Sequence, residues 1–188
     1  MDAEKASAAD TSFFELFQIE PSVDIHLPSL EATYHRLSLK LHPDCNTHAD
    51  LKTRLHSLEQ TAQLNRAYAT LSNPQRRALY LLKIYGINLE DSQNPLQAPL
   101  SFLNHMLELR EQLQQASLSR QTDKLENLER FATEAMEKKL ELGCQCLRDG
   151  LGHGPPEKLQ QAALHLVCVR YWQRFLEDVE CFQEELSS

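Results

Sequence analysis

Residues 30–47 read LEATYHRLSLKLHPDCNT, and this stretch decides the fold of the amino-terminal half of the chain. Its large apolar side chains recur at spacings of four, three and four, the period of one helix face: Leu30, Tyr34, Leu37 and Leu41. The helix has to end near Leu41, because Pro43 disfavours helical geometry in the residue before it and has no backbone N–H to donate. We therefore expect an amphipathic helix from Pro28 that runs into an exposed loop.

The loop begins with His42-Pro43-Asp44, and the helix before it carries basic side chains on its polar face: His35, Arg36 and Lys40. The proline restricts the turn and so fixes how the side chains of His42 and Asp44 are presented. A basic helix face beside a rigid charged loop is suited to docking on an acidic partner. The plainer interpretation is a helix-stop turn beside a solvated face, and the tripeptide alone does not exclude it.

Two further helices are expected to complete this half of the chain. A long one should run from about residue 49 to residue 71, with these side chains facing inward: Leu51, Leu55, Leu58, Ala62 and Ala67. Asn73 followed by Pro74 is a helix start signal, so a shorter helix should run over residues 74–85 and end at Gly86.

The pattern of prolines divides the chain into two domains. Residues 87–99 hold two prolines together with Asn and Asp and have no helical stripe, so we expect a linker there. Residues 13–86 before it should form one helical domain, preceded by a disordered tail over residues 1–12. Residues 100–188 after it show three long helical patterns with short connections, which favour a three-helix bundle: 100–115, 123–148 and 157–186. The expected fold is all-α, a helical hairpin followed by a three-helix bundle.

Composition excludes several classes of function. The net charge of -8 argues against a protein that wraps a nucleic acid, because that affinity comes from neutralised phosphates. No apolar run is long enough for a membrane span and the amino terminus has no leader pattern, so we expect a cytoplasmic protein that binds no membrane. There is no phosphate-binding glycine loop and no G-x-S-x-G motif, so we do not expect an enzyme.

Several stretches of the sequence resemble one family. Residues 13–86 resemble a J-domain, with His42-Pro43-Asp44 matching its signature loop. The end of this region looks like the version of the J-domain found in the HscB family: Tyr68, Pro74, Arg77, Ala78, Tyr80, Leu81 and Leu82. Residues 102–111, FLNHMLELRE, look like the start of the carboxy-terminal bundle of HscB. The chain is thus similar, over nearly its whole length, to the co-chaperones of iron–sulfur cluster assembly.

The resemblance implies a two-site adaptor that aids the maturation of iron–sulfur proteins. The J-domain would stimulate the ATPase of a DnaK/HscA-type heat-shock chaperone through a loop and a basic helix face: His42, Pro43, Asp44, Arg36 and Lys40. The bundle would hold the IscU-type cluster scaffold through one face: Leu103, Leu107, Glu108, Arg110, Glu111 and Tyr171. Phe175 competes with Tyr171 for its place, and Asn104 and Gln115 stand where the family has an apolar residue and an acid.

Two other functions remain open at this point. A general J-protein that serves another client would share the first domain, and spacing alone would assign Leu103 and Leu107 to the bundle core. A metal-binding or redox protein using Cys144 and Cys146 belongs to a different class. Residues two apart in a helix point in different directions, and no Cys/His pair with zinc-like spacing stands nearby. We therefore expect no metal and no cofactor.

Overall fold

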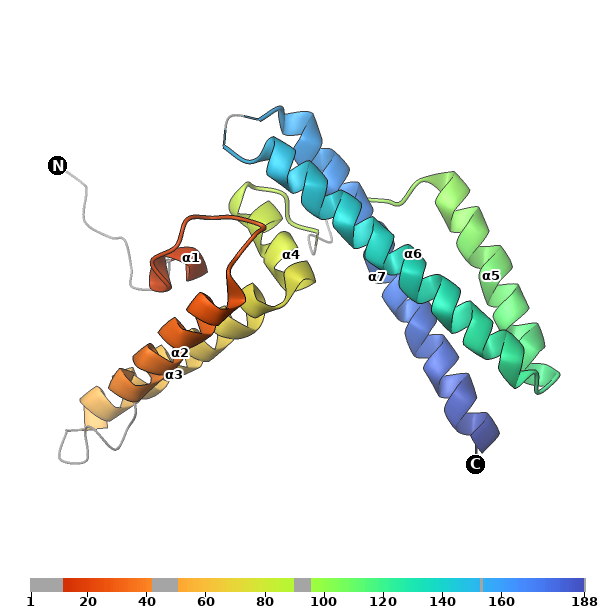
Figure 1. Cartoon of the computed structure of the whole chain (residues 1–188), viewed down its shortest axis with the longest axis horizontal. Coiled ribbons are helices and arrows are strands. Elements are labelled where there is room, and N and C mark those ends of the chain that lie inside the picture. The colour runs from red at the N-terminus through yellow and green to blue at the C-terminus, as the bar shows by residue number, and fades with distance from the viewer. Residues whose placement is uncertain (1–11, 42–50, 90–95, 153, 188) are drawn as a thin grey trace. The chain divides into compact units, whose positions relative to one another are not determined.

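The computed structural model describes residues 12–41, 51–89, 96–152 and 154–187. Every regular element within these ranges is a helix, so the expected all-α fold is confirmed (Figure 1). The helices are α1 (Phe13–Leu16), α2 (Leu27–Leu41), α3 (Leu51–Ser72), α4 (Pro74–Ile84), α5 (Leu100–Leu118), α6 (Thr122–Gly150) and α7 (Pro156–Ser187). None of the helices in the described ranges is long and apolar enough to cross a membrane.

The chain divides into two compact units, Met1–Leu81 and Leu82–Ser188. In the first unit α2 and α3 form an antiparallel hairpin, which the aromatic rings of Tyr34 and Tyr68 hold together by stacking 4.3 Å apart. The Tyr34 hydroxyl also donates a hydrogen bond of 2.9 Å to the side chain of Asn65. Leu30 on α2 is buried and Tyr34, Leu37 and Leu41 are half-buried, as the spacing predicts.

The inner face of α3 differs from the one expected. Leu55 and Leu58 are more than half exposed, at 53% and 55%, and Ala62 is exposed as well. The buried face instead contains Ala67, which was expected, together with other residues at helical spacing: Ser57, Leu64 and Leu71. Polar residues are tolerated near this face because their hydroxyls bond within the helix, as Thr61 Oγ1 does to the Ser57 carbonyl at 2.8 Å.

Helix α4 begins and ends at the signals that the sequence carries. The Asn73 side chain accepts a hydrogen bond of 3.0 Å from the backbone N–H of Arg76, so Asn73 is the N-cap. At the other end Gly86 has a φ of 83°, and the Ile87 N–H returns to the Leu82 carbonyl at 2.8 Å. This left-handed glycine stops the helix, because most side chains disfavour that conformation.

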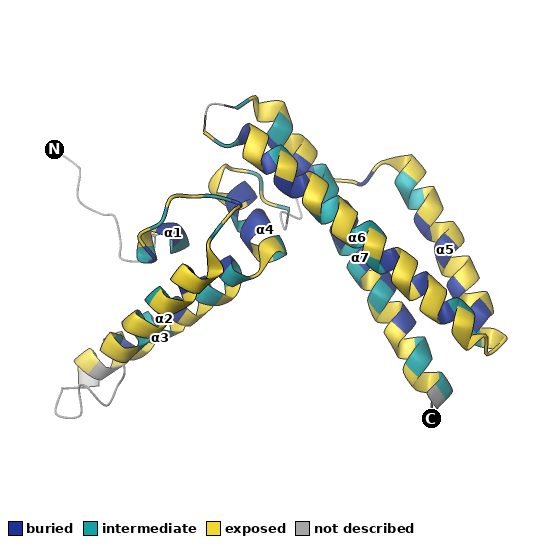
Figure 2. Ribbon diagram, in the orientation of Figure 1, coloured by how far each residue is buried: buried dark blue, intermediate teal, exposed yellow. Residues whose placement is uncertain are grey.

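The second unit is a three-helix bundle. α6 and α7 run antiparallel along most of their length, and α5 lies beside them (Figure 1). α5 is parallel to α7, since Phe102 meets Tyr171 near the start of α5 and Arg110 meets Asp178 two turns later. Buried side chains from all three helices form the main core of the bundle (Figure 2): Met106, Leu109, Leu113, Ala116, Leu125, Leu128, Ala132, Trp172, Phe175 and Val179.

Two described residues of the expected linker pack on this bundle. Leu89 and the buried Ala98 lie against Val167 and Cys168 of α7. Arg170 on α7 donates a hydrogen bond of 3.1 Å from Nη1 to the Leu89 carbonyl. The described ends of the segment are therefore attached to the second unit, and the proposed domain bounds, 13–86, 87–99 and 100–188, stay a prediction.

Candidate partner-binding surfaces

The basic face predicted on α2 is exposed. Arg36 and Lys40 are both exposed, whereas Leu30 of the same helix is buried. His35 beside them is exposed too, with its Nε2 3.7 Å from a Glu31 carboxylate oxygen one turn earlier. The adjoining residues of the predicted chaperone-binding loop, His42, Pro43 and Asp44, lie outside the described residues.

Residues predicted to bind the scaffold come together where α5 packs on α7. Leu103, Leu107 and Arg110 from α5 and Tyr171 from α7 line one hollow of about 190 Å³, with Met106 at its base. Met106 is 4% exposed whereas Leu107 is 60% exposed, so the hollow has a core floor and an open apolar wall. An exposed leucine beside a shallow apolar hollow can receive an apolar side chain from a partner.

The two acids of the predicted face do not line this hollow. Glu111 lies one turn after Leu107 and is exposed. Glu108 is turned toward His105, whose Nδ1 is 3.9 Å from a Glu108 carboxylate oxygen. The hollow is therefore lined mainly by apolar side chains together with the charged Arg110, and such a mixture is usual in a transient interface.

The structure separates Tyr171 from its competitor Phe175. Tyr171 is half-buried, lines the hollow and meets the Phe102 ring edge-on with centroids 5.9 Å apart. Phe175 is fully buried in the bundle core. Of these two aromatic residues, only Tyr171 has a surface that a partner can reach.

A second hollow, which the sequence did not predict, continues along the same helices. It has a volume of about 440 Å³ and is lined by Arg110, Leu113, Gln114, Asp178, Cys181 and Phe182. The signal for it is the seven-residue spacing from Leu103 to Arg110 on α5, which is repeated from Tyr171 to Asp178 on α7. On two parallel helices, residues with equal spacing can line one seam. The spacing alone does not show which residues meet across that seam, because this depends on the register of the two helices.

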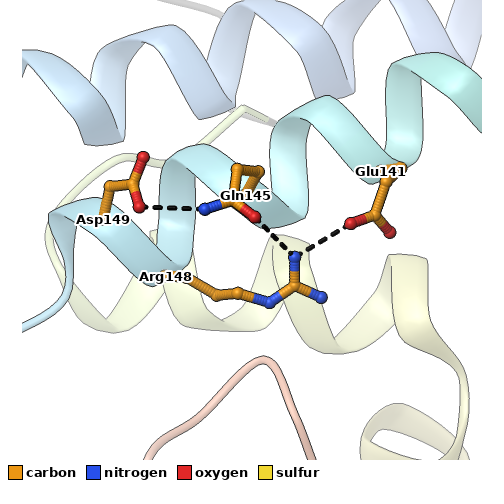
Figure 3. A network of polar contacts seen from close by, with 4 residues as sticks. All are labelled: Glu141, Gln145, Arg148 and Asp149. Atoms are coloured by element: carbon orange, nitrogen blue, oxygen red, sulfur yellow. Dashed lines mark hydrogen bonds and ion pairs between the residues drawn. The ribbon is translucent and has the colours of Figure 1, made fainter.

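Cys144 and Cys146, the pair considered for a metal or redox site, differ in burial. Cys144 is buried and Cys146 is half-buried, and the side chain between them, Gln145, joins an exposed polar network (Figure 3). In that network Gln145 donates to Asp149 at 3.0 Å, and Arg148 donates to Glu141 at 2.9 Å. No group of three or more His, Cys, Asp or Glu residues that could hold a metal ion occurs in this part of the chain.

Comparison with known proteins agrees with both halves of the fold. Residues 12–80 match the DnaJ domain family, and residues 98–180 match the HSCB C-terminal oligomerisation domain family. A co-chaperone protein HscB homolog from Neisseria meningitidis is 36% identical over 128 residues, which cover 68% of this chain and 76% of the relative.

Solved structures with the same fold include two HscB proteins. The chaperone HscB from Vibrio cholerae superimposes with a TM-score of 0.74 at 26% identity, covering 94% of this chain and 99% of that one. The human co-chaperone protein HscB superimposes with a TM-score of 0.78 at 21% identity, covering 95% and 85% of the two chains. With a DnaJ domain followed by an HscB carboxy-terminal domain, the chain belongs to the HscB family of J-domain co-chaperones, which act in iron–sulfur cluster assembly.

Proposed function

We propose that this co-chaperone is a two-site adaptor that brings an IscU-type iron–sulfur cluster scaffold to an HscA-type member of the heat-shock chaperones. The observation that supports the scaffold site is the open hollow on the second unit, where Leu103, Leu107, Arg110 and Tyr171 converge. A surface of this kind binds a protein and performs no chemistry of its own, so in this proposal the chain is not an enzyme. The cytoplasmic location expected from the sequence stays a prediction.

The chaperone site is proposed on the first unit. His42, Pro43 and Asp44 follow α2 directly in the sequence, and Arg36 and Lys40 of α2 are exposed. Basic side chains steer encounter with an acidic surface, and the loop would then trigger ATP hydrolysis on the chaperone. Hydrolysis converts the chaperone to its tight-binding state while the scaffold is held nearby.

Holding both partners on one chain raises the effective concentration of the scaffold at the chaperone. The linkage produces this effect without any direct contact between scaffold and chaperone. A variant that loses the scaffold site should therefore keep its basal stimulation of the ATPase and lose only the part that depends on the scaffold.

The scaffold site is tested by the affinity of the intact protein for a purified IscU-type scaffold, measured by isothermal titration calorimetry. Leu107→Ala should weaken binding by about ten-fold, because Leu107 provides the open wall of the hollow. Leu118→Ala is the matched control, since Leu118 is on the same helix, is 80% exposed and lines neither hollow. Equal affinities for both variants and the natural chain would contradict the proposed site.

A further inference from the structure

The second hollow is continuous with the first one through Arg110. The Arg110 side chain lines both hollows, and its guanidinium lies 3.5 Å from the Asp178 carboxylate across the seam between α5 and α7. The two hollows and the ion pair between them form one groove, which we call the α5–α7 groove. It begins at Leu103 and Tyr171 and reaches Gln114 and Phe182.

The chemistry of the α5–α7 groove alternates along its length. The first hollow is walled by Leu103, Leu107 and Tyr171, and the second contains Leu113 and Phe182. The ion pair separates these apolar regions and makes the middle of the groove polar without a net charge. From Leu107 to Leu113 the distance along α5 is roughly 9 Å, at a rise of 1.5 Å per residue.

This pattern defines the segment that fits the groove. Two apolar side chains roughly 9 Å apart could enter the two hollows. Between them an uncharged hydrogen-bond acceptor suits Arg110, because Asp178 already balances the charge of the guanidinium, which has five N–H donors. A carboxylate at that point would have to compete with Asp178, so the groove favours a neutral segment.

Both members of the ion pair are about half exposed, at 48% and 49% of their side-chain surface. Exposed pairs of this kind contribute little to folding, because water screens both charges. The fold therefore does not depend on the pair, whereas a bound partner would cover it and make its geometry matter.

We propose that the second hollow extends the scaffold-binding face, so that a single uncharged, apolar segment of the scaffold occupies the whole α5–α7 groove and hydrogen-bonds to Arg110, which Asp178 holds in position. This inference rests on the proposed function, because it assigns the same partner to a larger site. Continuity with the first hollow through Arg110 supports the scaffold as the occupant, and the balanced charge at the centre of the groove supports an uncharged segment.

Cys181 supplies a test in the natural protein, because it is exposed and lines only the second hollow. Saturating scaffold should slow alkylation of Cys181 by iodoacetamide by at least about ten-fold. The rate at Cys146, on α6 and outside the groove, should not change. Peptide mass spectrometry of the intact protein measures both rates in one sample, with Cys146 as the internal control.

Substitution provides the second test. Cys181→Lys places a longer, charged side chain in the second hollow and should weaken scaffold binding by about ten-fold, because it fills space meant for an apolar side chain and its charge must lose water on binding. Gln112→Lys is the matched control, because Gln112 is exposed on α5, lines neither hollow and gains the same charge.

Asp178→Asn should weaken binding by about three-fold and make binding more sensitive to salt, because the positive charge of Arg110 then has no carboxylate to balance it. Circular dichroism should show all three variants folded as the natural chain is.

The possible outcomes separate this inference from the proposed function. If Leu107→Ala weakens scaffold binding while Cys181→Lys does not and Cys181 stays unprotected, the scaffold site ends at the first hollow and the inference is wrong. If the natural chain does not bind the scaffold at all, the proposed function fails and the inference fails with it. If Cys181→Lys instead changes the sedimentation of the protein alone, the occupant is a second copy of this chain, which also overturns the inference.

Discussion

Arg110 and Leu107 lie one turn apart on α5, and their exposures indicate different roles. Leu107 is 60% exposed and contributes little to the core, so its side chain is available to a partner. Arg110 reaches across to α7 and its place depends on Asp178. The apolar side chain would provide affinity and the charged pair would set which segment fits.

The four described cysteines should differ in reactivity. Burial raises the pKa of the Cys168 thiol, so little thiolate is present at neutral pH, and the side chain is only 3% exposed. Brief alkylation of the native protein should modify Cys181 first and leave Cys144 and Cys168 intact until urea is added. Mass spectrometry of the peptides checks this order, and rapid labelling of Cys168 in the native protein would contradict the packing of α7.

His165 should make the bundle sensitive to acid. Burial, and then the nearby charge of Lys139, lower the pKa of this imidazole below its ordinary value of about 6.5. The unfolded chain therefore takes up a proton near pH 6.5 that the folded chain does not bind, so this contribution to stability is present above that pH and is lost as the pH falls. His165→Gln should reduce the loss of stability between pH 7.5 and pH 5.5.

Urea unfolding followed by the fluorescence of Trp172, the only tryptophan, measures this loss in the second unit. Lys139→Gln should also reduce this loss of stability on acidification, but by less than His165→Gln does. Burial is the larger cause of the lowered pKa of His165. An identical loss for the natural chain and His165→Gln would show that His165 does not contribute.

At the scale of helices, local signals predict the elements well. Pro43, the pair Asn73-Pro74 and Gly86 mark helix ends because each acts locally: the prolines and the glycine through their own backbone, and Asn73 through a side chain that caps a nearby backbone N–H. Observed bounds follow them, as at α4, Pro74–Ile84. The periodicity of apolar residues likewise predicted α5, α6 and α7.

Side-chain placement was harder to predict where packing between helices decides it. Leu55 and Leu58 were expected inside because they are apolar, yet α3 buries Ser57 and Leu64 and leaves both leucines outside. The second hollow was missed for a related reason. The residues that line it come from two distant parts of the chain; Arg110 and Asp178, for example, are 68 positions apart. No local pattern fixes the register of α5 against α7.

The burial on α3 leads to a stability test. Leu64 is fully buried, so Leu64→Ala should lower the free energy of unfolding by about 2–4 kcal/mol through lost contacts and a cavity. Leu58→Ala removes the same atoms from an exposed site on the same helix. It should change the free energy of unfolding by less than about 0.5 kcal/mol. Urea titrations followed by circular dichroism compare the two variants, and a larger loss for Leu58→Ala would reverse the assigned face of α3.

At the scale of the whole molecule, the chain consists of two compact units with different surfaces. The first presents a basic helix face on α2 beside the segment that contains His42, Pro43 and Asp44. The second presents an apolar groove with a neutral centre. Surfaces this different suit two different partners, and their presence on one chain is the basis of the adaptor mechanism that we propose.

The most direct measurement is the steady-state ATPase rate of the HscA-type chaperone, with this protein added alone and together with the IscU-type scaffold. The natural chain should stimulate hydrolysis in both cases, and more when the scaffold is present. His42→Gln should abolish stimulation altogether, whereas the Leu103→Ala/Leu107→Ala double variant should keep the basal part and lose the part that depends on the scaffold. Absence of any stimulation by the natural chain, or full scaffold-dependent stimulation by the double variant, would contradict the two-site adaptor.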